Sequence, residues 1–445
     1  MKCQVLIIGA GPGGYVCAIR CAQAGLDTVI VDEEKPGGTC LNVGCIPSKA
    51  LIHAADEFHR LTHAAKSATG ITCSGPKIDF AATQSWKEGI VSKLTGGVEG
   101  LLKRAGAKLI HGSARFRDGK TVSLSDGTEI AADKIVIATG SAAVELPNLP
   151  FGGDILSSTE ALELSTVPKS LAVVGAGYIG LELGTAFAKL GTKVTIVEAI
   201  HSIMPLYDAG LTRPVAKRLD SLGIGVLTGT KALGFADGIL RTDNGDVAAD
   251  KVLVTVGRRP RTGDIGIDEL ALTLDGAFIK IDASCQTSMR GIYAIGDVTG
   301  EPMLAHRAMA QGELVADHIT GKPASWDKRA IPAVCFTDPE IVSVGDEPGR
   351  DGTKSAEFRF SANGRAMSIE REDGFVRITF RTSDHVITGI QAVGAGVSEL
   401  SASFALAIEM GARLEDIAAT IHAHPTQSEA FQEAALSGLG RALHA

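Results

Sequence analysis

One short pattern occurs twice in the chain, and this repeat is the strongest constraint on its fold. The apolar run Val5–Ile8 leads into a glycine-rich turn, Gly9-Ala-Gly-Pro-Gly-Gly14, and a helical pattern follows. The second copy spans Ala172 to Gly180 with the same glycine spacing. A second apolar strand follows each helical pattern, and the two strands end in Asp32 and Glu198. This order of elements predicts two Rossmann-like dinucleotide-binding units.

The residue types in the repeat fit the chemistry of a dinucleotide. Glycines permit a sharp turn and let the backbone approach the pyrophosphate, which the amides at the helix N-terminus then bind. The acid after the second strand can accept hydrogen bonds from a ribose. In the second unit Glu198 would repel the 2′-phosphate of NADP, and no arginine cluster follows it, so NAD is favoured. Arg258 and Arg259 follow a different strand, and we interpret them as surface or interdomain charge.

A second repeated feature closes each unit. Asp126-Gly127 and Asn244-Gly245 predict tight hairpins, and each is followed by a buried strand and a glycine. Beyond Pro323, alternating patterns predict strands near 358–360, 375–380 and 386–393, and helices at 400–410 and 414–421. The expected fold class is therefore α/β, with two Rossmann-like domains and a C-terminal α+β domain. The predicted ranges are 1–143 and 144–264 for the two dinucleotide-binding units, 265–325 for a central segment, and 326–445 for the C-terminal domain.

Composition and charge argue against several classes of protein. The 445 residues carry a formal net charge of −8, which is not typical of a nucleic-acid-binding surface. The chain starts directly with a strand and a glycine turn, unlike a signal peptide. The most apolar long stretch, 171–188, contains Glu182 and several glycines, so we expect no membrane span. The eight cysteines are scattered through a large chain, which favours the cytoplasm.

Two of these cysteines have unusual surroundings. Cys40 and Cys45 lie five positions apart, in the segment Gly37–Lys49 directly after the first acid-ended strand. A zinc site needs about four ligands, and no matching cysteine pair occurs elsewhere, so we expect no metal. Two inert thiols are the other alternative. A redox-active disulfide fits best, since helix amides and Lys49 would stabilise a thiolate there.

The segment Gly37-Gly-Thr-Cys-Leu-Asn-Val-Gly-Cys-Ile-Pro-Ser-Lys49 resembles the active-site signature of the pyridine nucleotide–disulfide oxidoreductases, and within them the dihydrolipoamide dehydrogenase branch. Similarity to this family extends over nearly the whole chain. Further segments that resemble it are Val256–Pro260, Ala294–Val298, Pro302–His306, Phe336–Glu340 and His422–Glu429.

The resemblance implies an FAD domain, an NAD domain, a central segment that completes the FAD domain, and a C-terminal dimer interface. It also implies a catalytic role for Lys49 near the flavin, paired with Glu182. The implied FAD contacts are Gly9, Gly11, Gly14, Asp32, Glu33, Gly38, Thr39, Lys49, Gly112, Thr139, Gly140, Ser141, Asp297, Met303, Leu304, Ala305 and His306. The implied NAD contacts are Gly175, Gly177, Tyr178, Ile179, Gly180, Glu182, Glu198, Ala232 and Gly257.

Near the C-terminus, Glu429 follows His424 by five residues, and a carboxylate can orient an imidazole and raise its basicity. The resemblance implies that this pair comes from the partner subunit of a homodimer and faces the disulfide. His424 would take a proton from dihydrolipoamide, whose thiolate attacks Cys40, and Cys45 would pass electrons through FAD to NAD. The lipoyl group would belong to a 2-oxo acid dehydrogenase or glycine cleavage complex. We interpret His422 as a solvated surface residue.

Three details depart from the family pattern. Asp32 replaces a commoner glutamate, with Glu33 beside it to share the role. The stretch from Asp32 to Cys40 is one residue short, and Gln427 replaces leucine.

Two other functions stay open. One is another disulfide reductase, of the glutathione or mercuric type, although arginines near Glu198 and C-terminal cysteines are lacking. The other is a non-catalytic flavoprotein sensor.

Overall fold

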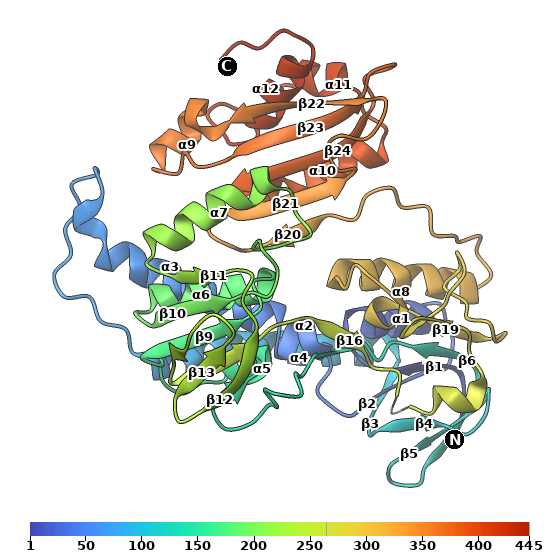
Figure 1. Ribbon diagram of the computed structural model, residues 1–445. Helices are drawn as coiled ribbons and strands as arrows, with labels where there is room; N and C mark the ends of the chain where they lie inside the picture. The colour runs from blue at the N-terminus through green and yellow to red at the C-terminus, as the bar shows by residue number, and fades with distance from the viewer. Residues whose placement is uncertain (264, 445) are drawn as a thin grey trace. The chain divides into compact units, whose positions relative to one another are not determined.

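The computed structural model describes residues 1–263 and 265–444, and these form two compact units (Figure 1). The first unit is made of Met1–Phe151, Leu156–Thr166 and Val256–Asp327. The second unit is made of Gly152–Ile155, Val167–Thr255 and Lys328–Ala445. Residues 264 and 445, where two of the predicted domain ranges end, lie outside the described residues. The four domain ranges stay a prediction.

A mostly parallel sheet forms the centre of the first unit. Its parallel strands lie in the order β3 (Lys108–His111), β2 (Thr28–Asp32), β1 (Lys2–Ile8), β6 (Glu129–Ile137) and β19 (Ile292–Ala294). Two antiparallel strands, β5 (Thr121–Leu124) and β4 (Ala114–Phe116), extend the sheet beside the first half of β6. Residues Val5–Ile8 of β1 and Val29–Val31 of β2 are continuously apolar and buried, as expected when helices or other elements cover both faces of a parallel sheet.

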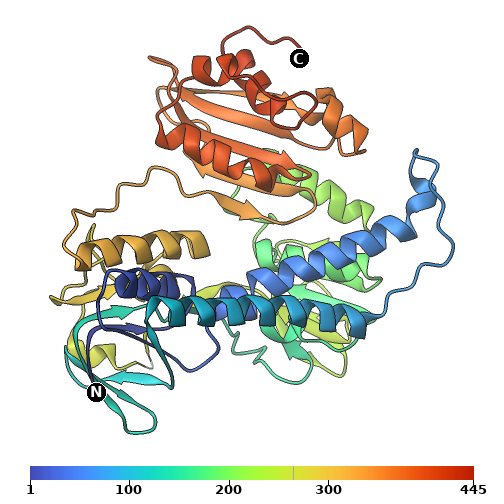
Figure 2. The same cartoon turned by 180° about the vertical axis from the view of Figure 1, so that it is seen from behind.

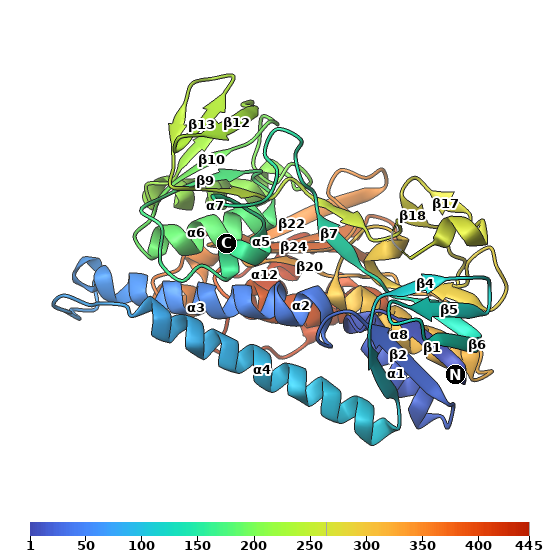
Figure 3. The same cartoon turned by 90° about the horizontal axis from the view of Figure 1, so that it is seen from below.

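Helices α1 (Pro12–Gln23) and α8 (Ala305–Ile319) pack together with their backbones in close contact. A Cβ atom on Gly312 of α8 would lie only 2.5 Å from the carbonyl oxygen of Gly13. Two longer helices, α3 (Cys45–Thr62) and α4 (Phe80–Ala105), run side by side in opposite directions, as Figures 2 and 3 show. The short helices α2 (Gly38–Asn42) and α5 (Ser158–Leu162) complete this unit.

The second unit repeats the plan with a smaller sheet. Its strands lie in the order β11 (Gly225–Leu227), β10 (Lys193–Val197), β9 (Ser170–Val174), β15 (Lys251–Val254) and β8 (Ile155–Leu156). Strand β9 leads through the second glycine turn into α6 (Tyr178–Lys189), and α7 (Ala209–Ser221) follows β10. The two predicted hairpins are confirmed, but they differ. In the first unit β6 is one continuous strand, whereas in the second β14 (Val247–Ala248) joins a separate small sheet with β12 (Ala232–Ala236) and β13 (Ile239–Thr242).

An antiparallel sheet covered by helices forms the C-terminal part of the second unit. Its order is β20 (Ala333–Cys335), β21 (Glu340–Gly345), β24 (Ile387–Gly394), β23 (Phe375–Arg381) and β22 (Thr353–Arg359). The core contains the fully buried Phe360 and Phe404. The sequence missed β20 and β21, and the strand expected near 358–360 ends at Arg359, where a turn of 3₁₀ helix begins. The helices are α9 (Gly364–Ser368), α10 (Ser401–Glu409), α11 (Leu414–Ala419) and α12 (Glu429–Gly438).

A buried carboxylate connects the Rossmann-like and C-terminal parts of this second unit. Asp338 pairs with Lys189 of α6 at 2.7 Å, with Arg218 of α7 at 2.9 Å and with Arg371 at 2.7 Å. Burial alone would raise the pKa of Asp338, but the three cations outweigh it and hold that pKa well below its usual value.

The predicted fold class, α/β with a C-terminal α+β domain, is confirmed. Among the described residues, no helix is both long and apolar enough to cross a membrane.

Candidate active site

The first parallel sheet brings most of the predicted FAD residues to one edge. Gly9, Asp32 and Gly112 lie at the carboxyl ends of β1, β2 and β3, and Asp297 follows β19. Adjacent parallel strands end side by side, so residues far apart in sequence meet at this edge. The other predicted FAD residues lie in α2 and α3, directly after β6, and at the start of α8: Gly38, Thr39, Lys49, Thr139, Gly140, Ser141, Met303, Leu304, Ala305 and His306.

The first glycine turn has the geometry of a pyrophosphate cradle. Cβ atoms on Gly9 and Gly14 would lie 2.3 Å and 1.9 Å from backbone carbonyl oxygens, so a side chain at either position would displace the backbone. Gly11 differs, because the nearest atom to its Cβ would be 4.0 Å away. Its missing side chain leaves space beside the N-terminus of α1, where helix amides favour an anion. This combination fits the phosphates of FAD.

Asp32 fastens the same turn. Its Oδ2 accepts a hydrogen bond from the amide of Ala10 at 2.5 Å, and its Oδ1 accepts one from the amide of Glu34 at 2.8 Å. Burial raises the pKa of Asp32 more than these two hydrogen bonds lower it. The neighbouring Glu33 accepts a hydrogen bond from Ser113 at 2.7 Å and pairs with Arg261 at 3.4 Å. Both acids therefore lie at the end of β2, as a ribose contact requires.

The chain geometry after Asp32 places the cysteine pair against the glycine turn. The amide of Gly37 donates to the carbonyl of Ala10 at 2.8 Å, and Gly37 and Gly38 have φ values of 105° and 57°. A Cβ on Gly38 would lie 2.6 Å from Cα of Gly11. Glycine permits both this backbone conformation and this close approach. The segment therefore places Cys40 beside the first glycine turn. The shorter connection noted in the sequence is compatible with this arrangement.

Cys40 lies in α2, and Cys45 is the first residue of the 18-residue helix α3. Both are thiols here, and their side chains hydrogen bond to each other. This hydrogen bond raises the pKa of Cys40, burial and repulsion from Cys45 raise it further, and the charge of Lys49 acts in the opposite direction. A thiolate at Cys45 would be stabilised by the N-terminus of α3. The raised pKa of Cys40 favours its thiol form in this reduced pair.

The second glycine turn repeats the first in detail. Oε2 of Glu198 accepts the amide of Ala176 at 2.6 Å, and its Oε1 accepts the amide of Ile200 at 2.9 Å. A Cβ on Gly180 would lie 2.2 Å from the carbonyl oxygen of Gly175, whereas a Cβ on Gly177 would meet no atom of the described chain within 4 Å beyond its chain neighbours and its own helix backbone. This geometry fits a second dinucleotide. The expected NAD residues Tyr178 and Ile179 begin α6, and Ala232 begins β12.

Two expected interactions join residues of different units and stay predictions. Lys49 belongs to the first unit and Glu182 to the second, and Gly257 belongs to the first unit while the other predicted NAD residues belong to the second. Within the second unit, Glu182 is 4% exposed, and its Oε1 accepts the amide of Phe336 at 2.9 Å. The sequence did not predict this contact, which fastens α6 to the segment after β20.

The His424–Glu429 pair is formed within one chain. Nδ1 of His424 lies 2.9 Å from Oε1 of Glu429, and the amide of Thr426 donates to Oε2 at 2.8 Å. Burial raises the pKa of Glu429, but the hydrogen bonds from Thr426 and His424 outweigh it and lower that pKa. An ionised carboxylate only accepts hydrogen bonds, so Nδ1 carries the hydrogen and Nε2 is the basic nitrogen. The His424 side chain is 80% exposed, while His422 hydrogen bonds to the carbonyl of Thr420.

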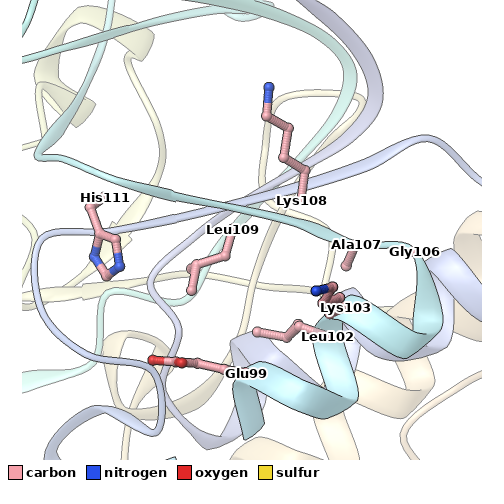
Figure 4. Close-up of a pocket in the computed structure, with 8 residues that line it drawn as sticks. All are labelled: Glu99, Leu102, Lys103, Gly106, Ala107, Lys108, Leu109 and His111. Atoms are coloured by element: carbon pink, nitrogen blue, oxygen red, sulfur yellow. The ribbon is translucent and has the colours of Figure 1, made fainter. Parts of the chain in front are cut away.

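A surface pocket of about 460 Å³ lies elsewhere in the first unit, between the end of α4 and the edge strand β3. Figure 4 shows Glu99 and Leu102 of α4 on one side and Leu109 and His111 of β3 on the other. None of its lining residues belongs to the predicted site. The candidate site of the first unit therefore consists of the cysteine pair and the first glycine turn, and the second unit carries the second glycine turn.

Comparison with known proteins agrees with this geometry. Residues 3–312 match the family model for pyridine nucleotide-disulphide oxidoreductases, and residues 331–435 match the dimerisation domain of that family. The chain is 53% identical to dihydrolipoyl dehydrogenase of Pseudomonas aeruginosa, covering 100% of this chain and 99% of that protein. Dihydrolipoyl dehydrogenase of Geobacillus stearothermophilus is 45% identical, with 100% and 98% covered.

Solved structures give the same result for the fold. The crystal structure of LpdA from Mycobacterium tuberculosis superposes with a TM-score of 0.90 at 26% identity, covering 97% of this chain and 99% of that chain. The HOCl-induced flavoprotein disulfide reductase RclA from Escherichia coli, at 24% identity, has a TM-score of 0.87 and the same coverage, and it shows the fold alone. The chain belongs to the pyridine nucleotide-disulphide oxidoreductase family.

Proposed function

We propose that this chain is a dihydrolipoyl dehydrogenase, which oxidises protein-bound dihydrolipoamide to lipoamide with NAD⁺ as the electron acceptor. One observation carries the proposal: Cys40 and Cys45 hydrogen bond to each other beside the first glycine turn. Two relatives that match over nearly their full length, both named dihydrolipoyl dehydrogenase, support this substrate over other disulfides.

The two glycine turns assign the cofactors. Gly11 and Asp32 would hold the pyrophosphate and ribose of FAD, and Gly177 and Glu198 would hold those of NAD. FAD bound there would supply the two-electron chemistry that links the cysteine pair to NAD. Glu198 would disfavour NADP, since its carboxylate would repel a 2′-phosphate.

His424 would act as the base for the substrate thiol. Its Nε2 accepts the thiol proton, and Glu429 keeps the ring in the required tautomer and stabilises its charged form. With the enzyme in its disulfide form, the substrate thiolate attacks Sγ of Cys40, and the bond to Cys45 breaks. Cys45 then leaves as a thiolate at the N-terminus of α3.

His424 then releases this first proton to solvent and takes a second one from the remaining substrate thiol. The resulting thiolate completes the exchange. It attacks the substrate sulfur bound to Cys40, which forms the lipoamide disulfide and releases the Cys40 thiolate. This thiolate takes the proton from His424. Two electrons have then moved from the substrate to the cysteine pair. We propose that Lys49, near the flavin and paired with Glu182, supports this electron transfer.

We propose that the active site is shared between two chains of a homodimer. The match to a dimerisation domain and the exposed imidazole of His424 support this arrangement. His424 of one chain would serve Cys40 and Cys45 of the other. The partner that presents the substrate would be a lipoyl domain of a 2-oxo acid dehydrogenase or glycine cleavage complex in the cytoplasm.

A paired assay tests the reaction. Purified enzyme should reduce NAD⁺ with dihydrolipoamide and should not oxidise NADPH with glutathione disulfide. Cys45→Ser should abolish the first activity, while Cys73→Ser, at an exposed cysteine outside the pair, should retain it. NADPH-dependent reduction of glutathione disulfide, without the lipoamide reaction, would refute both the substrate and the interpretation of Glu198.

A mixed-dimer experiment tests the shared site. Cys45→Ser and His424→Gln chains should each be inactive alone. When they are refolded together, half of the dimers contain one chain of each kind, and a site shared across a two-fold axis leaves one intact site in these dimers. Roughly one quarter of the wild-type activity should return. No recovery would place both residues of each site in the same chain.

A further inference from the structure

Arg258 has an unexpected place in the first unit. It begins β16 (Arg258–Pro260), which pairs antiparallel with β7 (Ser141–Ala143). Its Nε donates to Oγ of Ser141 at 2.8 Å, and its Nη2 donates to the carbonyl oxygen of Ser141 at 2.8 Å. Both hydrogen bonds therefore hold one residue by its side chain and its backbone. The adjacent Arg259 is exposed.

The network continues from Ser141 to Asp297. The Ser141 hydroxyl lies 2.6 Å from Oδ2 of Asp297. A guanidinium group can only donate, so the Ser141 oxygen must accept from Arg258 and give its own hydrogen to the carboxylate. Arg258 thus fixes the direction of the whole chain of hydrogen bonds. A serine without this donor could rotate its hydroxyl away.

Asp297 itself lies on the edge of the sheet that forms the candidate FAD site. The preceding amide, of Gly296, donates to the buried side chain of Gln311 at 2.7 Å, which fixes the local backbone. The carboxylate is then oriented through Oδ2 by Ser141. Its other oxygen, Oδ1, makes no hydrogen bond within the described part of the chain. That oxygen can accept a hydrogen bond from a ligand.

We propose that Arg258 is a positioning residue for FAD. Through Ser141 it holds the Asp297 carboxylate so that Oδ1 can accept a hydrogen bond from FAD. This inference rests on the proposed function, because it needs FAD in the first site. It gives Arg258 a role that the sequence interpretation as surface charge did not include.

The test is FAD binding to full-length protein. The holoenzyme is stripped of flavin, and the apoprotein is titrated with FAD while the quenching of flavin fluorescence is followed. Arg258→Met, which keeps a long apolar stem, should raise the dissociation constant for FAD about 10-fold, the scale of one hydrogen bond to a charged group. Arg259→Met is the matched control and should bind FAD like the wild type.

A double-mutant cycle separates positioning from a general structural effect. If Arg258 acts through Ser141, then Arg258→Met should add nothing once Ser141→Ala is present. Arg258→Lys should restore binding only in part, since an ammonium cannot reproduce the two-pronged contact. Should Arg258→Met not fold, Ser141→Ala alone must still weaken FAD binding.

Three results would overturn the inference: unchanged FAD affinity in Arg258→Met, equal weakening by Arg259→Met, or additive effects in the double variant. Failure of the wild-type protein to bind FAD is a different outcome, because it refutes the proposed function itself.

Discussion

Two glycines of the second turn should separate folding from cofactor binding. Gly180→Ala places a methyl group 2.2 Å from a backbone oxygen and 2.6 Å from Oγ1 of Thr255. The backbone oxygen cannot move without disturbing the turn after β9, and the Thr255 hydroxyl could move only by giving up its hydrogen bonds to the carbonyls of Val174 and Gly175. We therefore expect a loss of about 1–3 kcal/mol in the free energy of unfolding. Gly177→Ala meets no atom of the described chain within 4 Å beyond its chain neighbours and its own helix backbone, and its φ of −73° and ψ of 176° suit alanine. Its stability should change by less than about 1 kcal/mol.

The effect on NAD should be the reverse. A methyl group on Gly177 occupies the space that the pyrophosphate needs, and it should prevent at least one amide from reaching a phosphate oxygen. A hydrogen bond to a charged group contributes about 1.5–3 kcal/mol, so NAD⁺ should bind roughly 10–100-fold more weakly. Isothermal titration calorimetry of the holoenzyme gives the affinity, and thermal unfolding gives the stability.

A control from the first turn sharpens the comparison. Gly11→Ala is sterically equivalent to Gly177→Ala, so it should weaken FAD and leave NAD⁺ affinity unchanged once flavin is saturating. The reasoning is refuted if Gly177→Ala unfolds the protein, or if it binds NAD⁺ like the wild type. It is refuted equally if Gly180→Ala is as stable as the wild type.

Three further predictions follow from buried or oriented charges. Asp338→Asn leaves Lys189, Arg218 and Arg371 without their counter-charge, so the free energy of unfolding in denaturant should fall by about 3–5 kcal/mol. An unchanged denaturation midpoint would contradict this. Because the folded-state pKa of Asp338 is lowered, its stabilisation is present above the ordinary value of 3.8 and is lost as the pH falls below it; the acid slope of stability should be shallower in Asp338→Asn. Glu429→Gln should lower kcat/KM about 10²-fold or more with flavin content unchanged, since an amide does not stabilise the imidazolium form of the base; full activity would remove Glu429 from the mechanism.

The sequence was sufficient for features encoded in short, contiguous patterns. Both glycine turns, the acids that follow them and the cysteine pair could be found because the physical requirement acts within about 25 residues of chain. The hairpins at Asp126 and Asn244 were predictable for the same reason. Strands β20 and β21 were not predicted, because no strand pattern was found in the sequence at these positions.

Long-range polar contacts could not be read from the sequence. Ser141 and Asp297 are 156 positions apart, and Arg258 is 117 positions from Ser141. Nothing in the local sequence distinguishes Arg258 from the exposed Arg259. The same holds for Asp338, whose three cationic partners come from separate elements. Only the arrangement of the strands shows which charges meet.

The acid of the second turn has a consequence for attempts to change cofactor preference. Besides its proposed contact with a ribose, Glu198 holds the turn together through hydrogen bonds from the amides of Ala176 and Ile200. Replacing it with a small or basic residue to admit NADP would release both amides in the same step. A successful redesign must therefore supply a new acceptor for these two donors, so a single substitution at Glu198 should produce an enzyme that binds either dinucleotide poorly.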